Sequence, residues 1–321
     1  MSEPEAETHW LDEHRDAAEV AVVRSLAARV VAHHGGDLSR MRRALGYSNA
    51  TWIGDGLAVR IVNTPVVDAM SAEVALVRAL PLEVGHPKIL AAGTIEGHDW
   101  IVTEEVRGQN LQEAWVTLTP EQRRQAIRQL WERVRAVHEA TPSLRRFVGS
   151  HSGFIPATVD DAAAMAVRVS DPIGLTEMQR SRLHEIIDRY YRAAPVVKQV
   201  VNHGDLALMN ALWDGEVVAL LDFEFALLGP VEIDLCRLLF ESLVSKDGQR
   251  TDPDAGAAAV ALAARHTDPV HGRALLHGAA VLDQLRDVEI WLARRTEDWR
   301  PDRLLAGLLD EDGGYLESAL A

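Results

Sequence analysis

Asp205, Asn210 and Asp222 are three oxygen-bearing residues in a segment that favours their convergence. Between Asn210 and Asp222 the dipeptide Asp214-Gly215 separates two apolar runs, which predicts a β-hairpin. Because the strands of a hairpin run side by side, we expect Asn210 and Asp222 to flank its open end, a few ångströms apart. Asp205 lies upstream, in a loop that must pass nearby.

These three side chains suit magnesium and phosphoryl-transfer chemistry. Mg2+ takes one or two carboxylates, keeps several waters and binds substrate phosphates. Asp205 lies further up the loop and is better placed to accept a proton than to hold metal. A base aspartate, an amide ligand and a metal-binding aspartate after a hairpin are the components of phosphoryl transfer. Any one of them alone would more often be a loop or turn residue, and it is the combination that favours catalysis.

The hairpin is expected to have a turn of two residues, Asp214-Gly215. Such a turn would pair Trp213 with Glu216 and Ala211 with Val218. This register sets which residues face each other at the open end.

The motifs that carry these residues resemble those of the aminoglycoside phosphotransferase family, relatives of the protein kinases. The resemblance is carried by His203-Gly204-Asp205 with Asn210, by Leu221-Asp222-Phe223-Glu224 and by the stretch from Gly229 to Leu235. It implies an α+β, bilobal, protein-kinase-like fold that binds nucleotide between a small β-rich N-lobe and a larger, mainly helical C-lobe. It also implies that Asp205 is the catalytic base, that Asn210 and Asp222 bind Mg2+, and that His203 and Asp234 support the loop.

The same resemblance assigns the nucleotide site to the N-terminal part of the chain. The stretch from Gly46 to Ala50 is similar to the family's nucleotide-covering loop, and Arg60 takes the place of the usual strand lysine. Arginine keeps the positive charge and offers phosphate oxygens a bidentate fork. We expect Glu73 to pair with it and backbone groups near the lobe boundary to contact the purine of ATP or GTP. The full nucleotide-binding set is Ser48, Asn49, Arg60, Glu73, Glu104 and Val106.

Acidic residues in the C-terminal half are candidates for binding the acceptor molecule. They are Glu224, Glu232, Asp283 and Asp287. Asp283 and Asp287 are four residues apart, which places them on one helix face. An acidic lining would suit a polyamine sugar antibiotic, although a charged helix face is more often simply solvated.

The pattern of apolar residues predicts two lobes. Short β-like runs extend from Tyr47 to about Val106, including a hairpin with strands at 51–53 and 57–62 and a helix at 71–80 that Ser71 would cap. A helix at 12–33 precedes them, and amphipathic helices follow at 120–139, 177–193 and 272–295. We therefore predict a nucleotide-binding lobe at residues 1–106 and a catalytic and substrate-binding lobe at 107–321.

Composition excludes several other classes of protein. The chain of 321 residues has 48 acidic and 33 basic residues, and its net charge of −15 disfavours nucleic-acid binding. No apolar run reaches the ~20 residues that span a bilayer. The single Cys236 allows no intrachain disulfide, and the polar start does not resemble a signal peptide. We expect a cytoplasmic monomer or homodimer that binds neither nucleic acid nor membrane.

The expected function is Mg2+-dependent transfer of the γ-phosphoryl group of ATP or GTP to a hydroxyl of a small molecule. The acceptor would be an antibiotic, aminoglycoside-like or containing a nucleoside or sugar, and the transfer would give resistance. Two alternatives stay open at this point. One is a metabolic kinase for choline, a sugar or homoserine. The other is a catalytically weak, pseudokinase-like binding protein, which the missing strand lysine suggests.

Overall fold

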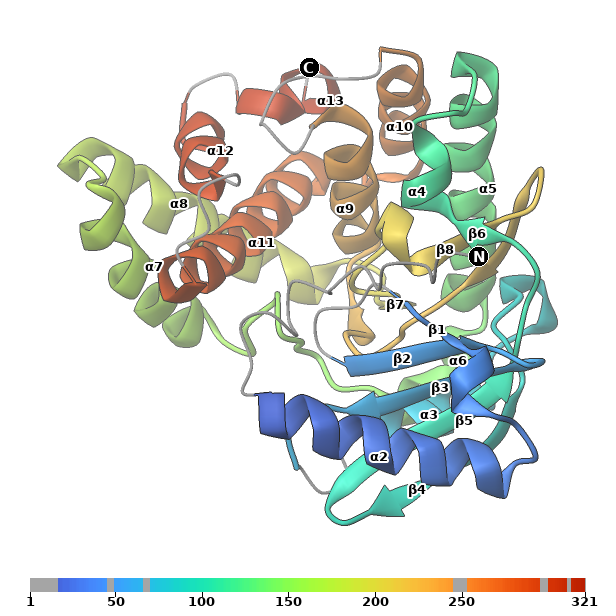
Figure 1. The fold of residues 1–321 in the computed structure, drawn as a ribbon. Coiled ribbons are helices and arrows are strands. Elements are labelled where there is room, and N and C mark those ends of the chain that lie inside the picture. Colours follow the sequence, from blue (N-terminus) through green and yellow to red (C-terminus); the bar gives the residue numbers. More distant parts are fainter. Residues whose placement is uncertain are drawn as a thin grey trace. The chain divides into compact units, whose positions relative to one another are not determined.

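The computed structural model describes residues 17–44, 49–65, 70–244, 253–294, 300–310 and 313–320. The chain divides into two compact units, Met1–Arg78 with Pro87–Arg107, and Ala79–His86 with Gly108–Ala321. The first unit carries a β-sheet and the second is mainly helical (Figure 1). The predicted α+β, kinase-like fold class is thereby confirmed.

The first unit is built on a five-stranded antiparallel sheet in the order β1-β2-β3-β5-β4. The strands are β1 (Arg42–Arg43), β2 (Asn49–Gly54), β3 (Leu57–Val62), β4 (Ile89–Ile95) and β5 (His98–Glu104). The predicted β2–β3 hairpin is present, but Gly54 pairs with Leu57, so the turn holds only Asp55 and Gly56, and both have the positive φ that a type I′ turn requires. Helix α2 (Ala17–His33) packs on the sheet, where Leu26 and Val30 share one apolar cluster with Val59.

Helix α3 (Ser71–Val77) begins as predicted at Ser71 and ends three residues early. The expected Ser71 cap is wrong, because Met70 occupies the N-cap position and no side chain caps the helix. Tertiary contacts fix this end instead. The Met70 side chain is buried, and its N–H donates to Oδ2 of the buried Asp99 at 3.2 Å.

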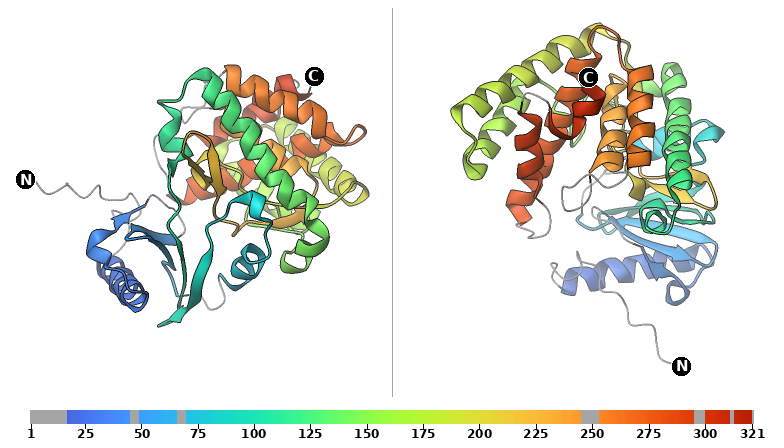
Figure 2. Two further views of the ribbon diagram at one scale, coloured as in Figure 1. Left: turned by 90° about the vertical axis from the view of Figure 1, so that its right-hand side faces the viewer. Right: turned by 90° about the horizontal axis from the view of Figure 1, so that it is seen from above.

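The second unit contains the remaining α-helices of the described ranges. They are α4 (Leu111–Trp115), α5 (Pro120–Glu139), α6 (Thr141–Leu144), α7 (Val159–Ile173), α8 (Glu177–Ala193), α9 (Glu232–Leu243), α10 (Pro253–His266), α11 (Gly272–Arg294), α12 (Pro301–Leu308) and α13 (Glu317–Leu320). Helix α10 lies between α5 and α9, and α7 and α8 pack against α11 (Figures 1 and 2). No helix of the described ranges is both long and apolar enough to cross a bilayer.

Short strands of the second unit position the loop that carries Asp205. They are β6 (Gln109–Asn110), β7 (Val200–Asn202), β8 (Ala211–Trp213), β9 (Val217–Leu220) and β10 (Leu227–Gly229). Strand β7 pairs with β10, and β8 lies between β6 and β9. The loop between β7 and β8 therefore starts on one small sheet and ends on another, and both of its ends are held.

The predicted hairpin exists, but its predicted register is wrong. Trp213 pairs with Val217, one residue beyond its predicted partner, and Ala211 pairs with Leu220 because the register shifts once more between Leu212 and Trp213. The connection therefore holds residues 214–216, as is common in hairpins with a bulge, and Gly215 has a φ of 80°.

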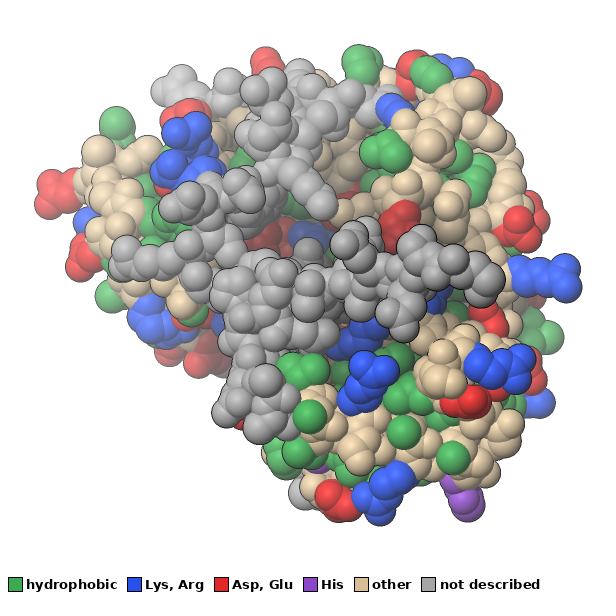
Figure 3. All heavy atoms as spheres, viewed as in Figure 1, with side chains coloured by type: hydrophobic (Ala, Val, Ile, Leu, Met, Phe, Trp, Pro, Cys, Tyr) green, Lys and Arg blue, Asp and Glu red, His purple; other side chains and the backbone are tan. Residues whose placement is uncertain are grey.

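The charge of the second unit is not gathered into one surface patch in the view of Figure 3. Acidic and basic side chains of the described residues are interspersed on this face.

Candidate active site

Asp234, near the start of α9, fixes the backbone of the loop between β7 and β8. Its carboxylate is fully buried and accepts three hydrogen bonds. Oδ2 accepts from the His203 N–H at 2.9 Å and lies 2.8 Å from His138 Nε2, while Oδ1 accepts from the Gly204 N–H at 3.0 Å. This is the geometry required of a residue that supports the loop.

His203 connects the loop to the segment that precedes Asp222. The ring is fully buried, with Nε2 2.9 Å from the Leu221 carbonyl oxygen and Nδ1 3.3 Å from the Asp205 backbone nitrogen. A carbonyl can only accept and an amide N–H can only donate, so the ring is neutral with its proton on Nε2. One side chain thereby positions the backbone on both sides of the site.

Gly204 allows the loop to approach the following segment closely. Its φ is 82°, and a Cβ added there would lie 2.0 Å from the Phe225 carbonyl oxygen. Only glycine fits this position without moving the chain.

The Asp205 carboxylate is held in one orientation through both of its oxygens. Oδ1 accepts from Arg237 Nε at 2.9 Å, and Oδ2 accepts from Asn210 Nδ2 at 3.0 Å. The Asn210 amide nitrogen also donates to the Asp205 carbonyl oxygen at 2.9 Å. The side chain keeps an exposed fraction of 13%, so part of it is open to a ligand.

Asn210 and Asp222 flank the open end of the hairpin. The Leu221 N–H donates to the Asn210 carbonyl oxygen at 2.8 Å, and Asp222 follows directly with a φ of 59°. Both contacts of the Asn210 amide nitrogen go to Asp205, and no described residue is bonded to Asn210 Oδ1. An amide oxygen and a carboxylate fit a Mg2+ ion that takes its other ligands from water and phosphates.

A metal site built from the protein alone is not seen in the described ranges. They contain no group of three or more His, Cys, Asp or Glu side chains arranged to hold a metal ion. Mg2+ at Asn210 and Asp222 would therefore depend on ligands from a bound nucleotide and water.

Arg237 and Glu241 belong to the site, although our sequence analysis did not identify them. Arg237 Nε contacts Asp205, its Nη1 lies 3.1 Å from Asp283 Oδ2, and its Nη2 lies 4.0 Å from Glu241 Oε1. Its guanidinium also lies 5.2 Å from the ring centre of Phe240. The signal in the sequence was the helical spacing of Asp234, Arg237 and Glu241, which places them on one face of α9.

Carboxylates outnumber cations around Arg237. Asp205, Glu241 and Asp283 face the guanidinium, and Gln284 Nε2 lies 3.3 Å from Asp283 Oδ2 and 3.4 Å from Asp287 Oδ2. We call Asp205, Glu241, Asp283 and Asp287 with Arg237 the acidic cluster. It unites the predicted acceptor residues Asp283 and Asp287 with the predicted base.

The electrostatics of the acidic cluster follow from burial and crowding. Burial, followed by the charge of Asp283, raises the pKa of Asp287 to about 8. Burial also raises the pKa values of Asp283 and Glu241, against the opposing effect of Arg237. Burial alone would lower the pKa of Arg237, but Asp283 and Asp205 hold it well above its usual value. The cluster is thus short of positive charge.

The predicted ion pair between Arg60 and Glu73 is present in the first unit. The Arg60 guanidinium contacts the Glu73 carboxylate, and their side chains are only 16% and 5% exposed. Asn49 is buried on β2, whereas Ser48 lies outside the described residues. At the end of β5, the Glu104 N–H donates to the Lys88 carbonyl oxygen at 3.1 Å, and Val106 follows.

Two predicted acceptor residues are not placed in the acidic cluster. Glu232 is 1% exposed, and its Oε1 accepts from the Asp268 N–H at 2.7 Å in a separate pocket. Glu224 is partly exposed in the segment that follows Asp222. We therefore base the acceptor site on Asp283 and Asp287.

Residues 39–277 match the model of the phosphotransferase enzyme family. A search of curated protein sequences finds no match.

Several solved structures share the fold. APH(2")-IIia, solved with GDP and kanamycin, has a TM-score of 0.65 and 18% identity, covering 90% of this chain and 98% of its own. A thermostable mutant of aminoglycoside phosphotransferase APH(4)-Ia, solved with ADP and hygromycin B, has a TM-score of 0.61 and 16% identity, with coverages of 92% and 99%. Macrolide 2'-phosphotransferase MphH from Brachybacterium faecium has a TM-score of 0.58 and 17% identity, with coverages of 89% and 98%. The chain therefore belongs to the phosphotransferase enzyme family, with the kinase-like fold of the aminoglycoside phosphotransferases.

Proposed function

We propose that this phosphotransferase moves the γ-phosphoryl group of ATP or GTP to a hydroxyl of an amine-bearing antibiotic and so gives resistance. The observation that carries the proposal is the acidic cluster, in which the candidate base Asp205 and three further carboxylates share one cation, Arg237. An ammonium group of the acceptor would supply that charge and place a neighbouring hydroxyl at Asp205. The similar structures solved with kanamycin and hygromycin B support an acceptor of this kind.

Asp205 would accept the proton of the acceptor hydroxyl. Arg237 and Asn210 each engage one of its oxygens, so the carboxylate is already oriented before an acceptor binds. As the acceptor oxygen forms its bond to the γ-phosphorus, the bond from that phosphorus to the β–γ bridging oxygen breaks. The hydroxyl proton passes to Asp205, and a nucleoside diphosphate leaves.

Asn210 and Asp222 would hold Mg2+ through an amide oxygen and a carboxylate. When bound, Mg2+ would neutralise part of the negative charge of the nucleotide phosphates. His203 would hold these ligands in position relative to Asp205, because it contacts both the Leu221 carbonyl and the Asp205 amide.

Arg60 would bind the nucleotide phosphates, and this role can be separated from its ion pair. We expect Arg60→Ala to raise the nucleotide KM about tenfold and to lower stability by about 3 kcal/mol, because the buried Glu73 carboxylate loses the positive charge of the Arg60 guanidinium. In the double variant Arg60→Ala/Glu73→Ala, stability should recover while KM stays high. Thermal unfolding and steady-state kinetics test this prediction. If both the stability and the nucleotide KM of the double variant returned to wild-type values, Arg60 would have only a structural role.

Asp287 makes stability and acceptor binding depend on pH. Its pKa of about 8 in the folded chain exceeds the ordinary value of 3.8, so between these pH values the folded state binds more protons than the unfolded state. Its contribution to stability is thus complete below pH 3.8 and is lost as pH rises towards 8. We expect Asp287→Asn to be more stable than the wild type by on the order of 2 kcal/mol near pH 8, with the difference vanishing near pH 4.

The same Asp287→Asn variant should raise the KM of a cationic acceptor about tenfold. Denaturant unfolding across pH, together with acceptor kinetics, measures both effects. The exposed Asp310→Asn is the control. Stability curves for Asp287→Asn and wild type that run parallel across the pH range would contradict the assignment.

A panel of acceptors tests the proposed function. The chain is incubated with Mg2+ and ATP or GTP, and nucleotide consumption is measured for amine-bearing antibiotics, choline, homoserine and neutral sugars. We expect consumption with an amine-bearing antibiotic. Consumption with choline, homoserine or a sugar alone would favour a metabolic kinase. Nucleotide binding without consumption would favour a pseudokinase-like binding protein.

A further inference from the structure

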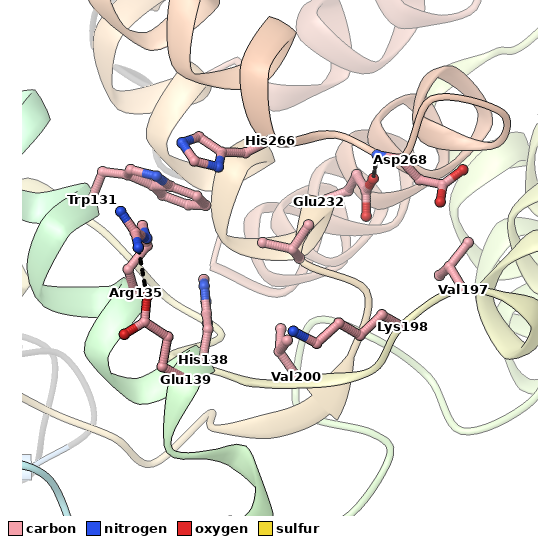
Figure 4. Close-up of a pocket in the computed structure, with 11 residues that line it drawn as sticks. Trp131, Arg135, His138, Glu139, Val197, Lys198, Val200, Glu232, His266 and Asp268 are labelled. Carbon is pink, nitrogen blue, oxygen red and sulfur yellow. Dashed lines mark hydrogen bonds and ion pairs between the residues drawn. The ribbon is translucent and has the colours of Figure 1, made fainter.

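A pocket in the helical unit includes His138, which contacts the Asp234 carboxylate that holds the loop carrying Asp205. It has a volume of about 270 Å³ and is lined by residues of α5, of the segment leading into β7, and of the ends of α9 and α10 (Figure 4). Asp205, Asn210 and Asp222 are not among its lining residues. At ~30 Å³ per water, the space would admit a small organic molecule.

The carboxylates of this pocket are already engaged. Glu139 pairs with Arg135 at 2.5 Å, and Asp268 Oδ1 accepts from the Val270 and His271 N–H groups at 2.9 and 2.7 Å. Glu232 accepts from the Asp268 N–H, and burial raises its pKa. A carboxyl with a raised pKa carries less negative charge and repels an anion less. Asp268 keeps its charge, because the His271 and Val270 N–H groups lower its pKa, and those donors already face it.

The cationic and donor groups of the pocket are less fully used. Lys198 is exposed, and no described residue forms a hydrogen bond or ion pair with its ammonium group. Figure 4 shows its side chain extending towards His138, with Arg135 and Glu139 beyond. Trp131, 2% exposed in the pocket wall, has an indole N–H without an acceptor among the described residues. The Lys198 ammonium group and the Trp131 indole N–H are thus available to bind a negatively charged ligand.

His138 connects the pocket to the loop of the candidate active site. The residue lines the pocket, and its Nε2 lies 2.8 Å from Asp234 Oδ2, which also accepts from the His203 N–H. No described residue is bonded to its other nitrogen, Nδ1. A ligand that contacts Nδ1 would fix the orientation of the ring and with it the contact between Nε2 and Asp234.

We propose that this pocket binds a small organic anion, either a carboxylate or a phosphate monoester, and that its occupancy tightens the loop around His203 and Gly204. Lys198 supplies the positive charge, the Trp131 ring supplies an apolar wall, and His138 transmits the effect through Asp234. Binding here does not depend on the proposed transfer reaction.

The test uses two probes on the full chain, inorganic phosphate and benzoate, titrated by calorimetry. We expect at least one of them to bind, and Lys198→Glu to weaken that binding about tenfold or more. Arg192→Glu, the same charge change at an exposed site on α8, should leave it unaltered. A response to phosphate alone identifies phosphate monoesters as the ligand class, and a response to benzoate identifies carboxylates.

Hydrogen exchange of the His203 and Gly204 amides measures the coupling. Both amides should exchange more slowly with the probe bound in the wild type, and their exchange should not respond to the probe in Lys198→Glu. The proposal would be overturned if neither probe bound, or if Lys198→Glu bound the probe as well as the wild type does. It would also be overturned if Arg192→Glu weakened binding as much as Lys198→Glu, or if the probe left the amide exchange unaltered. None of these readouts requires phosphoryl transfer, so they are independent of the proposed function.

Discussion

Asp205→Asn is expected to lower kcat about a thousandfold, the contribution typical of a general base. Asparagine keeps the size of the side chain and an oxygen for Arg237, but it cannot accept the hydroxyl proton. The acceptor KM should change by much less than kcat, because Asp283 and Asp287 are still present. The measurement is steady-state kinetics of the purified variant, with its melting temperature as the check on folding.

Asp214→Asn is the matched control for this prediction. It makes the same chemical change on the exposed turn of the adjacent hairpin. We expect it to keep wild-type turnover. If Asp205→Asn retains turnover within a few-fold of wild type, Asp205 is not the proton acceptor.

Asp234→Ala is expected to cause the largest loss of stability. It leaves the His203 and Gly204 N–H groups and the His138 ring without the carboxylate that now accepts from them. Each buried unsatisfied donor costs about 1–3 kcal/mol, so a loss of at least ~3 kcal/mol is expected. Turnover should fall as well, because the loop that presents Asp205 is no longer fixed.

Denaturant unfolding measures this loss, and Asp188→Ala is its control. Asp188 is an exposed residue of α8 at which the same truncation should change the free energy of unfolding by less than ~0.5 kcal/mol. Equal stability of Asp234→Ala and Asp188→Ala would show that Asp234 does not support the loop.

Elements with local sequence signals were predicted accurately. Helices α5 and α8 start and end at the predicted residues, and each opens with a capping box, Thr119 with Gln122 and Thr176 with Gln179. The β2–β3 hairpin was predicted from its Gly54-Asp55-Gly56 segment, of which Asp55 and Gly56 form the turn. The register of the β8–β9 hairpin was wrong, because the connection holds three residues and Val218 is an extra residue within β9, and neither feature leaves a local signal.

The candidate site was predictable where motif spacing determined it and not where tertiary contacts did. The convergence of Asp205 with Asn210 follows from the loop, and the pairing of Arg60 with Glu73 from the resemblance. The helical spacing of Arg237 from Asp234 places both on one face of α9, but it does not show that Arg237 contacts Asp205 and Asp283, which lie on other elements. Glu232 was grouped with the acceptor residues by charge alone, and its packing against Asp268 separates it from them.

Phosphorus NMR of the reaction product tests the central claim most directly. The chain is incubated with Mg2+, ATP or GTP and an amine-bearing antibiotic, beside matched samples with a chelator or with Asp205→Asn. The account predicts a phosphate monoester on the antibiotic in the first sample and almost none in the other two. Release of inorganic phosphate alone, or equal monoester formation by Asp205→Asn, would contradict it.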